Sequence, residues 1–138
     1  MADLLDEPAS YSIAEAAGRL GLTADTLRYY ERDGLLVETP RRAPSGHRRY
    51  TENDLGWILL ITRLRATGMP IRRVRAYADL CRQGEGNELA RLELLYQHRD
   101  QVLAQLAEVT DHLEAINRKI GAYEESVSTA QRRIARPA

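Results

Sequence analysis

The sequence predicts a mainly α-helical chain made of a compact head and one long helix. Two short helical segments with clear end signals lie near residues 13–33. An arginine-rich hairpin signal follows them, and apolar residues then recur at alternating spacings of three and four over residues 92–123. We therefore expect four regions: a head over 10–80, a linker over 81–87, a coiled-coil helix over 88–124 and a flexible tail over 125–138.

The first two helices have recognisable starts and stops. Ser12 and Glu15 have the spacing of a capping box, in which the hydroxyl accepts from an amide and the carboxylate reaches back. Apolar residues follow at helical spacing until Gly21, and Thr23 begins a second helix that Gly34 closes. Two short helices joined by a tight turn form a helix-turn-helix outline.

A β-hairpin is expected after the second helix. Residues 35–38 (LLVE) predict a short strand, and residues 48–50 (RRY) predict its return strand. Pro40, Pro44 and Gly46 favour a loop between them. A hairpin in this position makes the head a winged helix-turn-helix.

Two further helices complete the head. Thr51 is placed to cap a third helix that runs to about Ala66. Pro70 suits the first turn of a fourth helix ending near Cys81. The glycine-rich residues that follow predict the linker.

The long helix carries a heptad stripe. Nine of its ten a/d positions between residues 92 and 123 are apolar or Tyr, and Arg99 is the exception. A stripe of over four heptads favours a coiled coil, and the head is too small to cover it, so the simplest partner is a second copy of the chain. The residues assigned to dimerisation are Leu92, Leu95, Val102, Leu106, Val109, Leu113, Ile116 and Ile120.

Charge is unevenly distributed although the net charge is zero. Residues 10–80 contain 12 Arg and 8 acidic residues, whereas the residues from 81 onward contain 8 basic and 9 acidic residues. A basic head is a modest nucleic-acid signal. A single cysteine fits a reducing compartment, and no signal peptide or membrane-spanning run is present, so we expect a cytoplasmic protein with no membrane partner.

Four arginines crowd the expected hairpin, at positions 41, 42, 48 and 49, with no acidic residue between them. Like charges on one short hairpin repel each other unless an anion compensates them. Arginines also flank two tyrosines in the second helix, at residues 28–32 (RYYER). This chemistry suits contacts with phosphate, sugar and base edges.

Several segments in order resemble the MerR family of transcriptional regulators. They are residues 11–17 (YSIAEAA), 26–36 (TLRYYERDGLL), 46–50 (GHRRY), 54–55 (DL) and 68–71 (GMPI). The resemblance implies a homodimer with an antiparallel coiled coil, each protomer placing one helix in a major groove and its wing on backbone phosphates. It also implies that the dimer bends and untwists an overlong promoter spacer so that RNA polymerase engages both promoter elements.

The resemblance also assigns roles to single residues. Arg28 and Tyr30 match the groove-helix contacts, although the spacing equally allows Tyr30 to be a core residue. His47 stands where the family more usually has a Tyr among its wing contacts. The complete set assigned to DNA is Thr26, Arg28, Tyr29, Tyr30, Arg42, His47, Arg48, Arg49 and Tyr50.

The signal that such a regulator answers is less clear from the sequence. Little chain follows Tyr123, so no large effector domain is expected there. Cys81 lies where some metal sensors of the family have a first ligand, but thiolate metal sites need two or three cysteines and iron–sulfur clusters need four. We therefore expect no metal and no cofactor. Cys81 is either a redox sensor or a small buried apolar residue.

The sequence favours a non-enzymatic regulator of a stress or small-molecule response. No nucleophile–base pair or phosphate-binding loop supports catalysis. Two alternatives remain open. One is a coiled-coil adaptor whose head binds another protein, and the other is an architectural DNA-binding protein without a ligand response.

Overall fold

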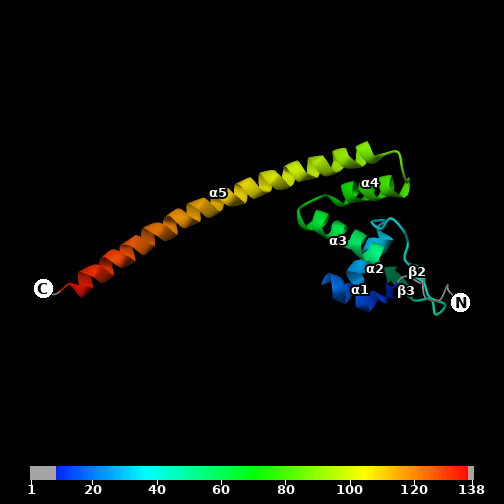
Figure 1. Cartoon of the computed structure of the whole chain (residues 1–138), viewed down its shortest axis with the longest axis horizontal. Helices are drawn as coiled ribbons and strands as arrows, with labels where there is room; N and C mark the ends of the chain where they lie inside the picture. Colours follow the sequence, from blue (N-terminus) through cyan, green and yellow to red (C-terminus); the bar gives the residue numbers. More distant parts are fainter. Residues whose placement is uncertain (1–8, 137–138) are drawn as a thin grey trace. The chain divides into compact units, whose positions relative to one another are not determined.

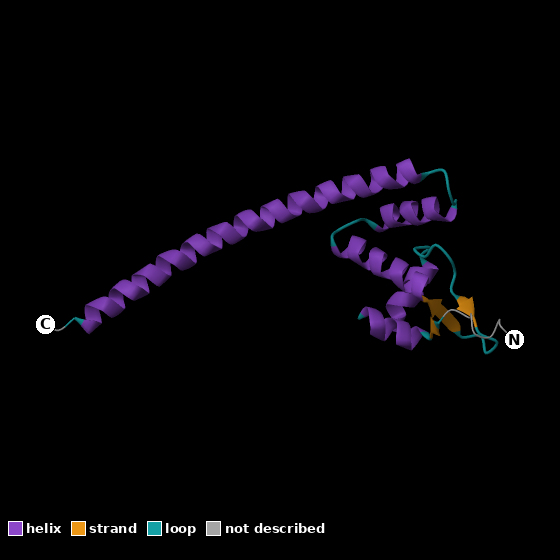
Figure 2. Ribbon diagram, in the orientation of Figure 1, coloured by secondary structure: helices purple, strands orange, loops and turns teal. Residues whose placement is uncertain are grey.

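The computed structural model describes residues 9–136 and confirms a mainly helical chain with a small sheet (Figures 1 and 2). Two units follow each other along the chain, and the second begins at Tyr96. The elements are β1 (Ser10–Tyr11), α1 (Ile13–Leu20), α2 (Ala24–Arg32), β2 (Arg41–Arg42), β3 (Arg48–Thr51), α3 (Glu52–Ala66), α4 (Ile71–Arg82) and α5 (Glu88–Ala135).

The helix-turn-helix forms through the predicted end signals. The Ser12 hydroxyl accepts from the amide of Glu15, and the Glu15 carboxylate accepts from the amide of Ser12, both at 3.1 Å. Gly21 ends α1 in the left-handed conformation, with a φ of 68° that favours glycine. The Thr23 hydroxyl then caps α2 by accepting from the amide of Thr26. Local side-chain caps therefore fix both helices.

The sheet has three antiparallel strands in the order β1-β3-β2. The predicted return strand is confirmed as β3, whereas the short strand β1 was not predicted. The predicted strand over residues 35–38 is wrong, because this segment is a loop and β2 begins only at Arg41. Leu35 and Leu36 are buried, and their carbonyls accept from Trp57 and Arg82 side chains instead of a neighbouring strand.

The core of the head lies where the short helices pack on β3, α3 and α4. The predicted third and fourth helices are confirmed as α3 and α4. Thr51 and Asp54 form a second capping box at the start of α3. The residues with no exposed surface come from four helices, one strand and two loops, namely Ala16, Leu27, Leu35, Tyr50, Ile58, Ile61, Met69, Val74 and Ala78.

A polar cluster ties β1 and α1 to the start of α3. The Glu52 carboxylate accepts from the Tyr11 hydroxyl at 2.5 Å and from the Arg19 guanidinium at 2.8 Å. The Tyr11 hydrogen bond, followed by that from Arg19, lowers the pKa of Glu52. Glu52 is therefore ionised and fixes the short strand that the sequence did not predict.

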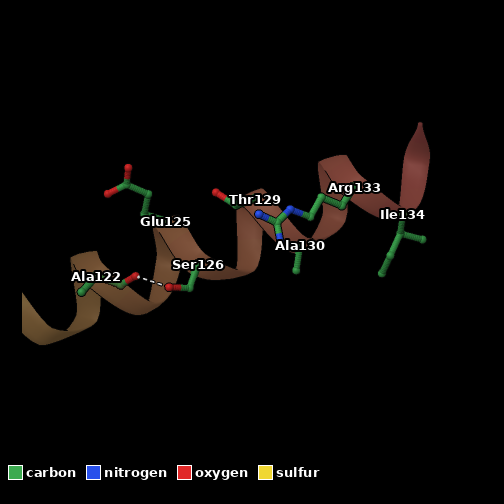
Figure 3. A pocket seen from close by; sticks show the side chains of 7 residues that line it. All are labelled: Ala122, Glu125, Ser126, Thr129, Ala130, Arg133 and Ile134. Atoms are coloured by element: carbon green, nitrogen blue, oxygen red, sulfur yellow. Dashed lines mark hydrogen bonds between the residues drawn. The ribbon is translucent and has the colours of Figure 1, made fainter. Parts of the chain in front are cut away.

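Residues 125–135 form a helix and not the flexible tail expected there, and residues 137–138 of that expected tail lie outside the described residues. Because α4 includes Cys81 and Arg82, the linker is shorter than predicted, and α5 continues to Ala135 instead of ending near residue 124. No glycine or proline interrupts residues 122–136, and Val127 and Ile134 continue the spacing of the stripe. Within this segment the Ser126 hydroxyl donates to the carbonyl of Ala122 at 3.0 Å (Figure 3).

We expect Trp57→Phe to lower the free energy of unfolding by about 1–3 kcal/mol, because it removes the donor to a buried carbonyl. The Trp57 Nε1 atom donates to the carbonyl of Leu35 at 2.8 Å, and the ring stacks on Tyr77 with centroids 5.4 Å apart. Phenylalanine can keep the stacking and lose the hydrogen bond. Urea unfolding monitored by circular dichroism measures the change, and an unchanged midpoint would contradict this role.

Candidate nucleic-acid interface

The exposed face of α2 is polar and carries Arg28. Its guanidinium pairs with the Asp25 carboxylate at 2.8 Å, and the two side chains are 49% and 92% exposed. An ion pair this exposed contributes little to stability, so Arg28 can exchange its partner for a phosphate or a base edge at small cost. Leu27 on the opposite face is fully buried and anchors the helix to the core.

The wing is a tight hairpin between β2 and β3. The amide of Gly46 donates to the carbonyl of Ala43, and the amide of Ala43 donates to the carbonyl of His47, both at 2.8 Å. Gly46 has a φ of 86°, the left-handed conformation that this type of three-residue loop requires. The turn therefore leaves His47 exposed at the start of the return strand.

The strand register places the wing arginines opposite one another. Arg41 faces Arg49, and Arg42 faces Arg48. Like charges in directly opposed positions destabilise a hairpin. Groups outside the hairpin offset part of this repulsion. Arg48 pairs with Glu31 of α2, and Arg49 donates to the hydroxyl and the carbonyl of Ser10.

The wing and α2 meet around one shallow basic hollow of about 260 Å³. Arg28 reaches it from α2, and Arg42, His47 and Arg48 reach it from the wing. The hollow also includes Ser12 and Ile13 at the start of α1. Four of the predicted DNA-contacting side chains, from α2 and from the wing, are thus brought together at one site.

A second hollow lies on the other side of the wing. Its volume is about 240 Å³, and its lining includes Arg41, Arg42 and Arg49. Arg41 is exposed and belongs to the four-arginine cluster for which the sequence predicts contacts with phosphate. That contact remains a prediction.

Two of the predicted DNA-contacting tyrosines are core residues instead. Tyr50 has no exposed surface, and Tyr30 is 7% exposed with its hydroxyl 3.4 Å from that of Thr62. Burial raises the pKa of Tyr50, whose hydroxyl has no hydrogen-bond partner within residues 9–136. Their side chains pack in the core beneath α2 and β3. The prediction that Tyr30 and Tyr50 contact DNA directly is therefore not retained.

Thr26 and Tyr29 occupy intermediate positions on α2. Both are half-buried, and the Thr26 hydroxyl lies 2.9 Å from that of Thr23 at the start of the helix. Partial burial raises the pKa of Tyr29, and a hydrogen bond with Asp33 raises it further. Arg32 lies over the Tyr29 ring at 5.9 Å. Their assignment to DNA remains a prediction.

Sequence reasoning did not find the residues that hold the arginines in place. Glu31 is an acidic residue of α2, and its role depends on a partner 17 positions away. Ser10 lies 39 positions from Arg49. Only the folded chain, which places α2 and β1 next to β3, shows these contacts.

The predicted dimerisation residues lie along α5. Leu106, Val109, Leu113, Ile116 and Ile120 are between 47% and 62% exposed in the single chain. Leu92 is 42% exposed, and Leu95 and Val102 are half-buried. The stripe is present as expected, and its pairing with a second copy remains a prediction.

Cys81 lies in the last turn of α4 and is half-buried. Burial, and then the charge and hydrogen bonding of Cys81, raise the pKa of the neighbouring Tyr77. Across residues 9–136, no group of three or more His, Cys, Asp or Glu side chains is placed to hold a metal ion. No helix within the same residues is long and apolar enough to cross a membrane.

Comparisons with known proteins identify the family of the chain. Residues 11–81 match the model of the MerR HTH family regulatory proteins. An uncharacterised HTH-type transcriptional regulator from Haemophilus influenzae is 32% identical over 117 residues, which cover 85% of this chain and 86% of that protein.

Two solved structures share the fold over most of their length. A putative MerR family transcriptional regulator from Listeria monocytogenes is 35% identical with a TM-score of 0.82, covering 90% of this chain and 93% of that one. HiNmlR, a MerR family regulator lacking the sensor domain and bound to promoter DNA, is 32% identical with a TM-score of 0.77. The match covers 87% of this chain and 94% of that one. The chain therefore belongs to the MerR family of helix-turn-helix regulatory proteins, which are transcriptional regulators and not enzymes.

Proposed function

We propose that this protein binds promoter DNA as a homodimer and controls transcription by distorting the promoter spacer. The observation that carries the proposal is the shared basic hollow between α2 and the wing. Arg28 projects from a helix that fits a major groove, while Arg42 and Arg48 offer charge to the adjacent phosphates. The similar HiNmlR structure, which is bound to promoter DNA, supports the same use of this surface.

The stripe on α5 supports the homodimer. A single chain exposes five large apolar side chains between Leu106 and Ile120 at roughly half of their surface. Covering such side chains is worth about 1.5–3 kcal/mol for each one that becomes fully buried. A second copy supplies the same stripe, and the family resemblance favours an antiparallel pair.

A dimer of this kind would present two copies of α2 and two wings to one DNA duplex. With both wings on backbone phosphates, the protein can bend the intervening spacer, at a cost that the additional contacts offset. RNA polymerase is the partner that would read the altered spacing in the cytoplasm. An architectural protein without a ligand response would use the same surface, whereas a protein adaptor would not need the facing arginines.

The regulatory signal is proposed to be a stress or a small molecule. Cys81 is the candidate thiol, because it lies beside Tyr77 in the last turn of α4, immediately before the linker. Oxidation of a half-buried thiol enlarges it and makes it polar, which would disturb that contact.

We expect Arg42→Gln to weaken duplex binding about equally on all sequences and to reduce the salt slope by about one, because one phosphate contact is lost. Fluorescence anisotropy at several salt concentrations measures both quantities. Arg118→Gln is the matched control, since it removes the same charge from an exposed position on α5. Equal slopes for Arg42→Gln and the wild type would contradict the wing contact.

We expect Leu113→Asp to convert the dimer into a monomer, because it places a charge in the middle of the apolar stripe. Sedimentation equilibrium reports the mass, which should fall from twice 15.6 kDa to 15.6 kDa. Ala115→Asp adds the same charge away from the stripe and should leave the dimer intact. A monomeric wild type, or a dimeric Leu113→Asp variant, would argue against pairing through this face.

We expect Cys81→Ser to abolish the response of a promoter reporter to hydrogen peroxide, which oxidises a thiolate to a sulfenic acid, while duplex binding by the untreated protein is kept. Serine preserves the size of the side chain and removes the oxidisable sulfur. An unchanged oxidant response would remove Cys81 from the signalling role.

A further inference from the structure

The loop that follows α2 is held by side chains instead of by strand pairing. Every carbonyl of residues 33–36 accepts a hydrogen bond from a side chain of α3 or α4. Arg75 Nε donates to the carbonyl of residue 33 at 3.0 Å, and Trp57 Nε1 donates to that of residue 35 at 2.8 Å. Arg82 donates to the carbonyls of residues 34 and 36. These donors fix the point at which α2 ends.

Arg82 makes the largest share of these contacts. Its Nε and one terminal nitrogen lie 3.1 and 2.6 Å from the carbonyl oxygen of Leu36. The same terminal nitrogen also donates to the carbonyl of Gly34, and the other one pairs with Asp79. A guanidinium that uses three nitrogens in this way is geometrically restrained, which a flexible lysine would not be.

Gly34 gives the loop the shape that Arg82 binds. Its φ of 71° lies in the left-handed region, which turns the chain back against α4. The amide of Leu35 then donates to the carbonyl of Tyr30 at 3.0 Å, so the end of α2 and the loop form one hydrogen-bonded unit. A displacement of the Arg82 side chain would therefore displace the last turn of α2 directly.

Arg82 is also the last residue of α4, next to the linker that leads into α5. The side-chain Nδ2 of Asn87 donates to the carbonyl of Leu80 at 2.8 Å. The Arg91 guanidinium donates to the side-chain oxygen of Asn87 at 2.6 Å and to the carbonyl of Gly84. The first turn of α5 is thus tied to the last turn of α4, on the same stretch of chain that carries Arg82.

We propose that Arg82 is a positioning residue that couples the start of α5 to the end of α2. Displacement of the linker moves the last turn of α4, and the guanidinium carries that displacement to the carbonyls behind α2. The consequence of this coupling for DNA binding rests on the proposed function, because the coupling would adjust how the helix that bears Arg28 meets the groove. The coupling itself is a property of the free protein.

Amide hydrogen exchange of the free protein, measured by NMR, tests this coupling without DNA. Asn87→Ala loosens the linker and touches none of residues 33–36, yet it should accelerate exchange of the Asp33, Gly34 and Leu35 amides. Arg82→Met keeps the aliphatic stem, and should accelerate the same amides by about tenfold or more, the factor that corresponds to one charge-assisted hydrogen bond. The Asn87→Ala, Arg82→Met double variant should show the same amide exchange rates as Arg82→Met alone, because without the guanidinium a displacement of the linker no longer reaches the loop.

Trp57→Phe is the matched control, since it frees the same loop from α3 and leaves the linker contacts in place. In the double variant of Trp57→Phe and Asn87→Ala, the two factors by which amide exchange is accelerated should multiply. Arg82→Lys, which keeps the charge and has fewer donors, serves in place of Arg82→Met if the latter unfolds. The proposal is overturned if Asn87→Ala accelerates only the Gly84 amide, or if its effect persists in full in the Arg82 variant. Failure of the wild-type protein to bind duplex DNA would count against the proposed function and leave this result unaffected.

Discussion

The ion pair between Arg48 and Glu31 is the contact on which the candidate DNA surface depends. It joins β3 of the wing to the helix α2, and its side chains are only 27% and 15% exposed. Removing either partner would leave a partly buried charge without compensation, which is costly. The pair also relieves the repulsion between Arg48 and Arg42 across the hairpin. It therefore links the two elements, α2 and the wing, that line the basic hollow.

Local signals in the sequence were enough to predict the helices of the head. Ser12, Thr23 and Thr51 each cap the helix that follows, and such caps act within three residues. The loop at residues 35–38 was mistaken for a strand because its partners are distant. Trp57 and Arg82 lie 22 and 46 positions from the carbonyls they bind, beyond the range of any local pattern.

The candidate site was predictable in its charges and less so in its aromatic residues. Arginines crowded on a short hairpin indicate a surface role whatever the details of the fold, and Arg42 is indeed exposed. A tyrosine can serve either the surface or the core, and Tyr30 and Tyr50 proved to be core residues. Serine and alanine after residue 125 favour a flexible tail, whereas α5 continues to Ala135, with Val127 and Ile134 at the spacing of the stripe.

In the proposed function, the head would contact DNA through Arg28 and the wing, and the apolar stripe of α5 would pair two copies of the chain. Hydroxyl-radical footprinting of the wild-type protein on a promoter fragment selected by its own binding tests whether the protein reads DNA in this two-fold way. A dimer of this kind should leave two protected backbone patches related by a dyad and separated by a spacer whose cleavage pattern changes as it is distorted. A single protected patch, or none, would contradict this two-fold mode of binding.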